Sequence, residues 1–290
     1  MRFLAEDRFK EQRRFLHFFL KNPLNVLGLV TVLGLIVVAF FAPQIAPYPE
    51  QGIGLSQVEN RLLSPGLQHL LGTDDLGRDI LSRIIFGAQV SLRAALIVIS
   101  VVVAIGVPLG IIAGYFGGKV DEVIMRICDL FLAFPPLLLA IAIVAALGPS
   151  LINAMIALSV PWWPWYARIT RGQAISLKER QFVEAARAVG VSDFRIVFRH
   201  ILPNCITPVI VLATLDMGYI ILSLASLGFL GLGTQPPTAD WGVMVSNGRT
   251  FILDQWWFST FPGIAILITV LGFNLVGDGV AETLNPKRRK

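Results

Sequence analysis

The chain has 290 residues, of which 55% are hydrophobic and only 15% are charged. Soluble globular domains carry about 25% charged residues, so this composition excludes an ordinary water-soluble protein built around one large core. The formal net charge is +5. The two cysteines, Cys128 and Cys205, have no spacing that pairs them, and we expect both to be inert packing residues.

Five stretches of the sequence contain no charged side chain: residues 22–49, 94–118, 130–167, 217–239 and 255–277. Each is longer than the ~20 residues that a helix needs to span a bilayer. The third stretch is too long for one helix, and the turn-forming Gly148-Pro149-Ser150 divides it into two short spans. The sequence therefore predicts an all-α integral membrane protein with six transmembrane helices.

In chain order, residues 1–21 mix charged side chains with phenylalanines, which predicts an amphipathic segment on the inner membrane surface. Residues 22–42 form the first span. A cleaved signal peptide is the alternative, but this apolar run is longer than such peptides use and no small-residue cleavage site follows it. Residues 43–90, rich in proline and polar side chains, are predicted to be extracytoplasmic. Residues 91–280 hold the other five spans.

The placement of lysine and arginine predicts the orientation of these spans. An even number of spans leaves both termini on one side, together with two further segments of the chain. The segments on that side, residues 1–21, 116–129, 168–203 and 278–290, hold 19 of the 24 basic residues. Because basic loops stay in the cytoplasm, both termini are predicted to be cytoplasmic. The basic tail, residues 281–290, follows the same rule, and we expect no nucleic-acid binding.

Motifs of catalysis are missing from the sequence. The histidines, His17, His69 and His200, are far apart and form no His-x-x-x-His metal site. Gly117-Gly118-Lys119 is the nearest approach to a phosphate-binding loop, but it lacks the upstream glycine and the following Ser or Thr. We therefore expect no catalytic residue, no metal site and no cofactor bound by this chain.

A polar insert at residues 176–203 interrupts the apolar spans and is typical of two short helices joined by a glycine. Ser176 and Glu179 have the spacing of a capping box, which predicts the start of the first helix. Gly190 suits the left-handed position after its end, and Ser192 is predicted to cap the second helix.

Each helix of this hairpin carries an apolar stripe. The stripes are Phe182, Ala185, Ala186 and Val189 in the first helix and Phe194, Val197, Phe198 and Ile201 in the second. Helices this short are marginal when isolated in water. We therefore expect the hairpin to pack against a soluble partner.

Polar and aromatic groups inside the spans are candidates for a solute path. Asp216 lies near the start of the fifth span, where a carboxylate is costly unless it faces water or a partner. A structural ion pair is the alternative. Trp162, Trp163 and Trp165 are candidates for stacking on a solute, with interfacial packing as the alternative. Closely spaced glycines predict tight contacts between helices at Gly106, Gly110 and Gly114 and again at Gly228, Gly231 and Gly233.

The hairpin resembles the signature of ABC importer permeases, which reads Glu-Ala-Ala, three residues, Gly, nine residues, Ile-x-Leu-Pro. This chain has Glu184-Ala185-Ala186, Gly190 and Leu202-Pro203, with His200 in place of the aliphatic residue. The run from Arg199 to Asn204 is similar to the Arg-His-Ile-Leu-Pro-Asn of the peptide branch. Over residues 20–286 the chain is similar to the second, C-type permease of dipeptide and oligopeptide importers.

Other segments extend the resemblance. They are Gly72–Asp79, Gly117–Asp121, Ala133-Phe134-Pro135, Arg171-Gly172, Phe229–Gly233 and Gly277-Asp278-Gly279. The ending Val280-Ala281-Glu282 departs from the usual Leu-Arg-Asp, which removes one basic residue and leaves the rest of the pattern unchanged.

The resemblance implies a type I ABC importer permease fold in the bacterial inner membrane. The implied partners are a homologous permease, two cytoplasmic ATPase subunits that bind ATP and Mg, and an extracytoplasmic solute-binding protein. It also implies a set of ATPase-coupling residues: Glu184, Ala185, Ala186, Gly190, Phe194, Arg199, His200, Leu202 and Pro203.

Two alternatives to a peptide permease remain open. Within the same family, nickel or another small solute is an alternative cargo. In a different class, a self-contained secondary carrier would need several ionisable groups at mid-membrane, and apart from Asp216 the apolar stretches hold none.

Overall fold

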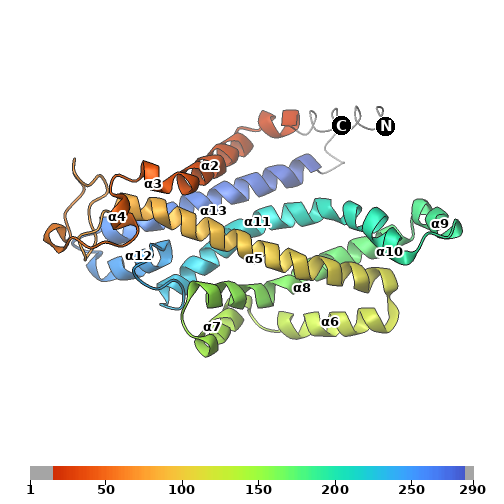
Figure 1. The fold of residues 1–290 in the computed structure, drawn as a ribbon. Helices are drawn as coiled ribbons and strands as arrows, with labels where there is room; N and C mark the ends of the chain where they lie inside the picture. The colour runs from red at the N-terminus through yellow and green to blue at the C-terminus, as the bar shows by residue number, and fades with distance from the viewer. Residues whose placement is uncertain (1–15, 285–290) are drawn as a thin grey trace. The chain divides into compact units, whose positions relative to one another are not determined.

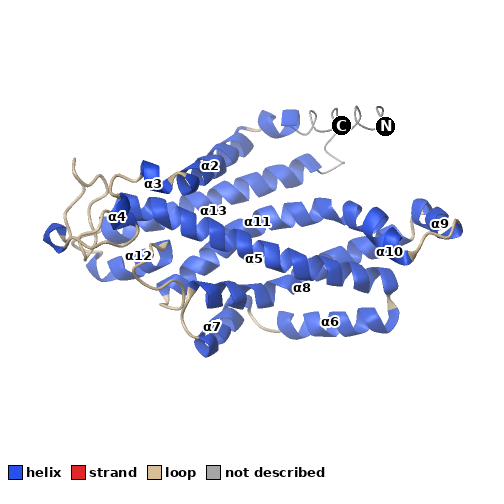
Figure 2. Cartoon of the chain, viewed as in Figure 1, coloured by secondary structure: helices blue, strands red, loops and turns tan. Residues whose placement is uncertain are grey.

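The computed structural model describes residues 16–284 of the chain. Every regular element in that range is a helix (Figure 2), and the only β-type pairing among these residues is one isolated bridge between Thr73 and Asp79. Of the predicted amphipathic segment, residues 16–21 are described and are helical, whereas residues 1–15 lie outside the described range. Residues 285–290 of the predicted basic tail also lie outside it.

Four helices are long and apolar enough to cross a membrane (Figure 1). They are α2 (Pro23–Phe40), α5 (Ile80–Phe116), the continuous helix Asp193–Phe229 that includes α10 and α11, and α13 (Trp257–Leu284). A fifth candidate is the pair α6 (Gly118–Leu132) and α7 (Pro136–Leu147), which is bent by 84° at the break between the two helices. The described residues thus confirm an all-helical protein with four or five apolar spans, while six spans stay a prediction.

The break predicted at Gly148-Pro149-Ser150 is confirmed. Gly148 has a positive φ of 91° after the end of α7, and the Ser150 hydroxyl accepts a hydrogen bond from the backbone N–H of Asn153 at the start of α8 (Leu151–Lys178). A helix of the length of α7, 12 residues, rises only ~18 Å. That is less than the ~30 Å thickness of a hydrocarbon core, so α7 needs α6 to complete a crossing.

The chain divides into two compact units, and the first comprises residues up to Leu92, residues 214–229 and residues from Pro236 onward. In it α2 and α13 run side by side (Figure 1). Gly28 lies against Leu275, and Gly272 lies against Thr31. Small residues at these positions let the two backbones approach closely, which is how apolar helices associate in lipid.

A second group of elements in this unit surrounds the segment before α5. Its short helices are α3 (Ala42–Ile45), α4 (Pro49–Gly52), η1 (Val58–Asn60), α12 (Trp241–Gly248) and η3 (Arg249–Phe251). The segment is held by buried charges: the Asp74 carboxylate accepts a hydrogen bond from Arg78 Nε at 2.7 Å, and the Asp79 carboxylate lies 2.9 Å from His69 Nδ1. Paired in this way, the buried groups avoid the cost of an unmatched charge. They lead into α5 at Ile80, so this helix begins inside the predicted 43–90 segment.

The second unit comprises residues 93–213 and 230–235. Its central feature is the approach of α5 to α8. A Cβ at Gly106, Gly110 or Gly114 would collide with α8, at Tyr166, Ala167 and Ala174 respectively. The predicted helix contact at these glycines is therefore confirmed, and it lies within the chain.

Of the later glycines, Gly228 agrees with the prediction and Gly231 differs from it. Gly228 lies against the side chain of Asp240, the N-cap residue of α12, so it does mark a close approach. Gly231 has φ of 77° and open space around its Cα, in the turn after α11 (Leu202–Phe229). It serves the turn, because a residue without Cβ adopts this backbone conformation at little cost.

The contact between α5 and α8 gives a matched pair of substitutions. Gly110→Ala places a methyl group against the Ala167 carbonyl and the Thr170 hydroxyl and is expected to destabilise the protein by about 1–3 kcal/mol. Gly172→Ala, on α8 with open space around the new Cβ, is expected to be neutral or to stabilise by up to about 1 kcal/mol. Thermal unfolding of the purified protein in detergent measures both. Equal effects of the two substitutions would contradict the close approach.

Candidate functional site: the hairpin between α8 and α11

The segment predicted as a two-helix hairpin joins α8 to α11 at one end of the second unit (Figure 1). Its first helix is α9 (Gln181–Ala188), and its second begins with α10 (Asp193–Ile196). The second helix passes through one π-helical stretch, η2 (Val197–Ile201), and continues directly into α11. The prediction of two separate short helices is therefore right for the first helix and wrong for the second.

The predicted capping box at Ser176 and Glu179 is wrong. Ser176 lies inside α8, which runs on to Lys178, and the N-cap position of α9 is Arg180 without a side-chain cap. Tertiary contacts explain the difference: Ala174 is fully buried, and its methyl group lies where a Cβ at Gly114 of α5 would come. This packing keeps α8 helical through Ser176, although the spacing of Ser176 and Glu179 favours the start of a new helix there.

The turn between the two hairpin helices is a Schellman motif centred on Gly190. The N–H of Gly190 donates to the Arg187 carbonyl at 2.9 Å, and the N–H of Val191 donates to the Ala186 carbonyl at 3.0 Å. Gly190 itself has φ of 78°, the left-handed conformation predicted for it. Ser192 does occupy the N-cap position of α10, but its side chain makes no capping hydrogen bond there.

The hairpin has an inward and an outward apolar face. The inward face consists of Val183, Ile196 and Ile201, which are fully buried. Of these three, only Ile201 belongs to a predicted stripe. The outward face consists of Phe182, Val189, Phe194 and Phe198, of which Val189 and Phe194 are 79% and 72% exposed. Such a cluster of exposed apolar side chains on one short segment marks an interaction site.

The predicted coupling residues differ in how far they are exposed. Glu184, Ala185, Phe194, Arg199 and Pro203 are exposed, Ala186 is buried, and His200 and Leu202 are half-buried. The rings of His200 and Phe182 lie 6.2 Å apart, so they link the second helix to the first. Glu184 lies in the first turn of α9.

Ion pairs that the sequence did not reveal connect α6 with α8 just before the hairpin. Arg171 on α8 makes two hydrogen bonds to the Asp121 carboxylate on α6, at 2.5 and 2.6 Å. Two parallel bonds of this kind fix the relative orientation of both side chains. One helical turn earlier, Arg168 reaches Asp129 at 2.5 Å.

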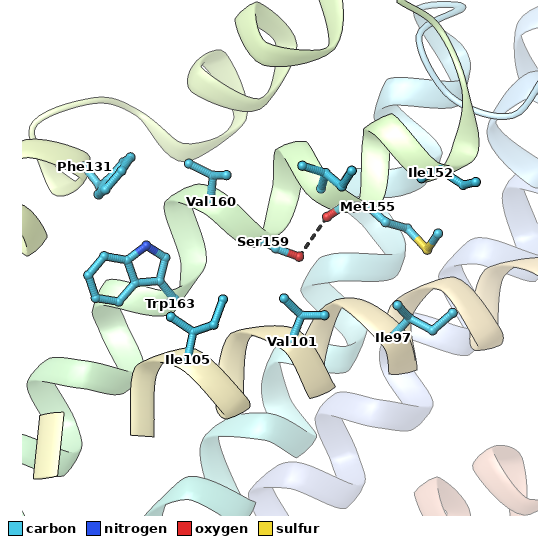
Figure 3. Close-up of a pocket in the computed structure, with 10 residues that line it drawn as sticks. Ile97, Val101, Ile105, Phe131, Ile152, Met155, Ser159, Val160 and Trp163 are labelled. Atoms are coloured by element: carbon cyan, nitrogen blue, oxygen red, sulfur yellow. Dashed lines mark hydrogen bonds between the residues drawn. The ribbon is translucent and has the colours of Figure 1, made fainter. Parts of the chain in front are cut away.

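A cavity of about 390 Å³ lies farther along the second unit, between α5, the end of α6 and α8 (Figure 3). Its walls are Ile97, Val101, Ile105, Phe131, Ile152, Met155, Ile156, Ser159, Val160 and Trp163. The one hydroxyl among them, on Ser159, already donates to the Met155 carbonyl at 2.8 Å. The cavity therefore offers an almost wholly apolar surface.

The predicted path residues are not brought together at this cavity. Trp163 lines it and meets Phe131 edge-on, with ring centroids 5.8 Å apart. Trp162 is buried and Trp165 is about half exposed, and neither lines the cavity. Asp216 belongs to the other unit, where it lies half-buried within α11.

Comparison with known proteins decides the family. Residues 106–290 match the family described as binding-protein-dependent transport system inner membrane component. The chain belongs to this family. Residues 12–65 also match the N-terminal transmembrane domain of oligopeptide transport permease C. The resemblance inferred from the hairpin residues is thereby confirmed.

Relatives of known sequence cover nearly the whole permease. The dipeptide transport system permease protein DppC of Alkalihalophilus pseudofirmus is 47% identical over 93% of this chain and 88% of its own length. The probable D,D-dipeptide transport system permease protein DdpC of Escherichia coli K12 is 46% identical over 92% of this chain and 88% of its own. The glutathione transport system permease protein GsiD of Escherichia coli O6:K15:H31 is 45% identical over 93% of this chain and 88% of its own.

The fold of the permease is similar to that of a solved ABC transporter. A chain of the MetNI methionine ABC transporter in an inward-facing conformation aligns with a TM-score of 0.54 and 19% identity. The alignment covers 70% of this chain and 97% of that one. Within residues 16–284 of the permease, no three His, Cys, Asp or Glu side chains are grouped as metal ligands would be.

The Schellman turn gives a prediction for the geometry of the hairpin. Gly190→Val forces a β-branched residue into a left-handed conformation and is expected to open the turn, whereas Gly190→Asn is tolerated because asparagine adopts this conformation more readily. A left-handed conformation costs a residue with a Cβ about 1–2 kcal/mol. Hydrogen exchange of the Gln181–Ala188 amides is therefore expected to become faster by an order of magnitude or more in the valine variant only. Equal protection in both variants would contradict a required left-handed residue.

Proposed function

We propose that this chain is a transmembrane permease subunit of an ATP-driven importer of dipeptides or oligopeptides. The observation that carries the proposal is the set of relatives at 45–47% identity over more than nine-tenths of the chain, whose names specify a dipeptide, a D,D-dipeptide or glutathione, itself a small peptide. In this proposal the chain has six spans in the bacterial inner membrane, both termini are cytoplasmic, and residues 43–79 are extracytoplasmic.

The proposed assembly supplies what this chain lacks. A second, homologous permease forms the other wall of the path, a solute-binding protein delivers the peptide from outside, and two ATPase subunits bind ATP and Mg in the cytoplasm. The permease itself contributes no catalytic group and binds no cofactor.

The hairpin is the proposed connection to one ATPase subunit. Its outward face, Phe182, Val189, Phe194 and Phe198, exposes apolar surface whose burial stabilises a complex by about 25 cal/mol per Å². Glu184 lies exposed in the first turn of α9, beside this face, where it meets a basic group or a helix N-terminus of the partner. Closure of the ATPase pair then moves the hairpin and switches the path from outward-facing to inward-facing.

The apolar cavity of the second unit is proposed to form part of the lining of that path, and Asp216, Trp162 and Trp165 stay separate candidates for contact with the solute. An apolar wall accepts peptides without selecting for charge, because it holds no fixed group that pairs with one. Selectivity then resides mostly in the binding protein. Trp165, about half exposed, is the predicted aromatic that is most accessible for stacking on a passing side chain.

Reconstitution tests the cargo. The permease is assembled in liposomes with its partner permease, the ATPase subunits and the binding protein, and uptake of a radiolabelled tripeptide is measured. We expect accumulation that requires ATP and is competed by unlabelled dipeptides and oligopeptides. ATP-driven uptake of Ni²⁺ or another small solute without peptide uptake would contradict the proposal.

Substitution of Glu184 tests the connection. Glu184→Arg reverses a charge on the outward face, so we expect peptide uptake to fall more than tenfold and the ATPase subunits to be lost on purification, with membrane insertion unchanged. Glu59→Arg, exposed in the extracytoplasmic segment, is the matched control and is expected to retain uptake. Normal uptake by the Glu184 variant would refute the docking role.

A further inference from the structure

Tyr115, at the end of α5, touches both helices of the hairpin. Its hydroxyl donates a hydrogen bond of 2.5 Å to the Asp193 carboxylate, at the first residue of α10. The guanidinium of Arg187, on α9, lies over the Tyr115 ring at 5.1 Å from its centroid. The tyrosine side chain is only 5% exposed. One buried side chain from a distant helix thus contacts α9 and α10 at once.

The two contacts differ in strength, because Arg187 is exposed to solvent. A hydroxyl that donates to a carboxylate forms a charge-assisted hydrogen bond, which is shorter and stronger than one between neutral groups. A guanidinium over an aromatic face is attracted by the electrons of the ring. Ser192, at the N-cap position of α10, makes no side-chain cap, and Asp193 after it uses its carboxylate to accept from Tyr115.

The first helix of the hairpin, α9, is weakly held. Only Val183 and Ala186 of α9 are buried, and the connection to α8 is the short, irregular pair Glu179 and Arg180. These two residues form a turn that belongs to neither helix, with the N–H of Arg180 bonded only as far back as the Leu177 carbonyl. Such a turn can act as a hinge about which α9 moves unless a further contact fixes it. Tyr115 supplies that contact from the end of α5.

We propose that Tyr115 is a positioning residue that joins the hairpin to α5, so that movement of the hairpin is passed to α5 and not lost at residues 179–180. The glycine contact then carries this movement into the pair of helices that lines the apolar cavity, since α5 and α8 are packed backbone to backbone. The inference rests on the proposed function, because it assigns a role in ATP-driven transport.

Removal of the Tyr115 hydroxyl tests this connection between α5 and the hairpin. In the reconstituted importer, Tyr115→Phe keeps the ring and the contact with Arg187 but removes the bond to Asp193. We expect the ATPase rate to stay within about twofold of that of the native importer. The amount of peptide transported per ATP is expected to fall about fivefold or more, because the coupling free energy between two sites typically corresponds to a factor of this size. A merely structural role would lower the unfolding temperature and the ATPase rate together and would leave the ratio unchanged.

Two further variants sharpen the result. Tyr48→Phe removes a hydroxyl that donates to the Gln68 carbonyl in the other unit, and it is expected to keep the native ratio. The double variant Tyr115→Phe with Asp193→Ala is expected to be no worse than Asp193→Ala alone, because both changes remove the same bond. Additive losses, or a native ratio in Tyr115→Phe, would overturn the inference.

A measurement without solute separates this inference from the proposed function. If the native importer takes up no peptide, the proposed cargo is wrong, and the joint is tested by spin labels at Ser100 on α5 and Gln181 on α9. Tyr115→Leu, which removes both the bond to Asp193 and the ring beneath Arg187, is then expected to broaden the distribution of distances between the labels, and Tyr48→Leu is expected to leave it narrow. An unchanged distribution in the Tyr115 variant would refute the joint whatever the importer carries.

Discussion

The close approach of α5 to α8 is the constraint on which the second unit depends. Gly106, Gly110 and Gly114 present backbone alone to α8, and any larger residue would collide with it. Between apolar helices in lipid there is no hydrophobic driving force, so contact of this kind supplies the packing energy. It also decides where α8 ends, because the buried contact at Ala174 carries the helix past Ser176 and sets the starting position of the hairpin.

The hairpin that begins after α8 has two apolar faces. Val183, Ile196 and Ile201 hold it to the permease, whereas Phe182, Phe194 and Val189 point outward and remain uncovered. A segment that lay idle on a surface would bury its aromatic side chains or would lack them. The outward face is the physical reason for proposing a partner, and the Schellman turn at Gly190 fixes the angle at which the two helices present it.

Local and compositional features of this chain could be predicted from its sequence. The break at Gly148-Pro149-Ser150, the left-handed Gly190 and the tight packing of Gly106, Gly110 and Gly114 depend on residue type and spacing, and the structure has all three. The end of α8 and the use of Asp193 could not be predicted, because each is decided by a residue of α5 far away in the chain. The 84° bend between α6 and α7 falls at Pro135-Pro136, where proline predicts a break, but residue type alone does not give its angle.

The most direct test of this account is the side of the membrane on which the hairpin lies and what covers it there. Val189→Cys, in a variant whose two buried cysteines are replaced, puts a thiol at the most exposed point of the outward face. A membrane-impermeant maleimide is predicted to leave it unlabelled in intact cells, to label it in inverted vesicles stripped of the ATPase subunits, and to be blocked when those subunits are restored. Labelling from outside intact cells, or labelling that the ATPase subunits do not affect, would contradict the account.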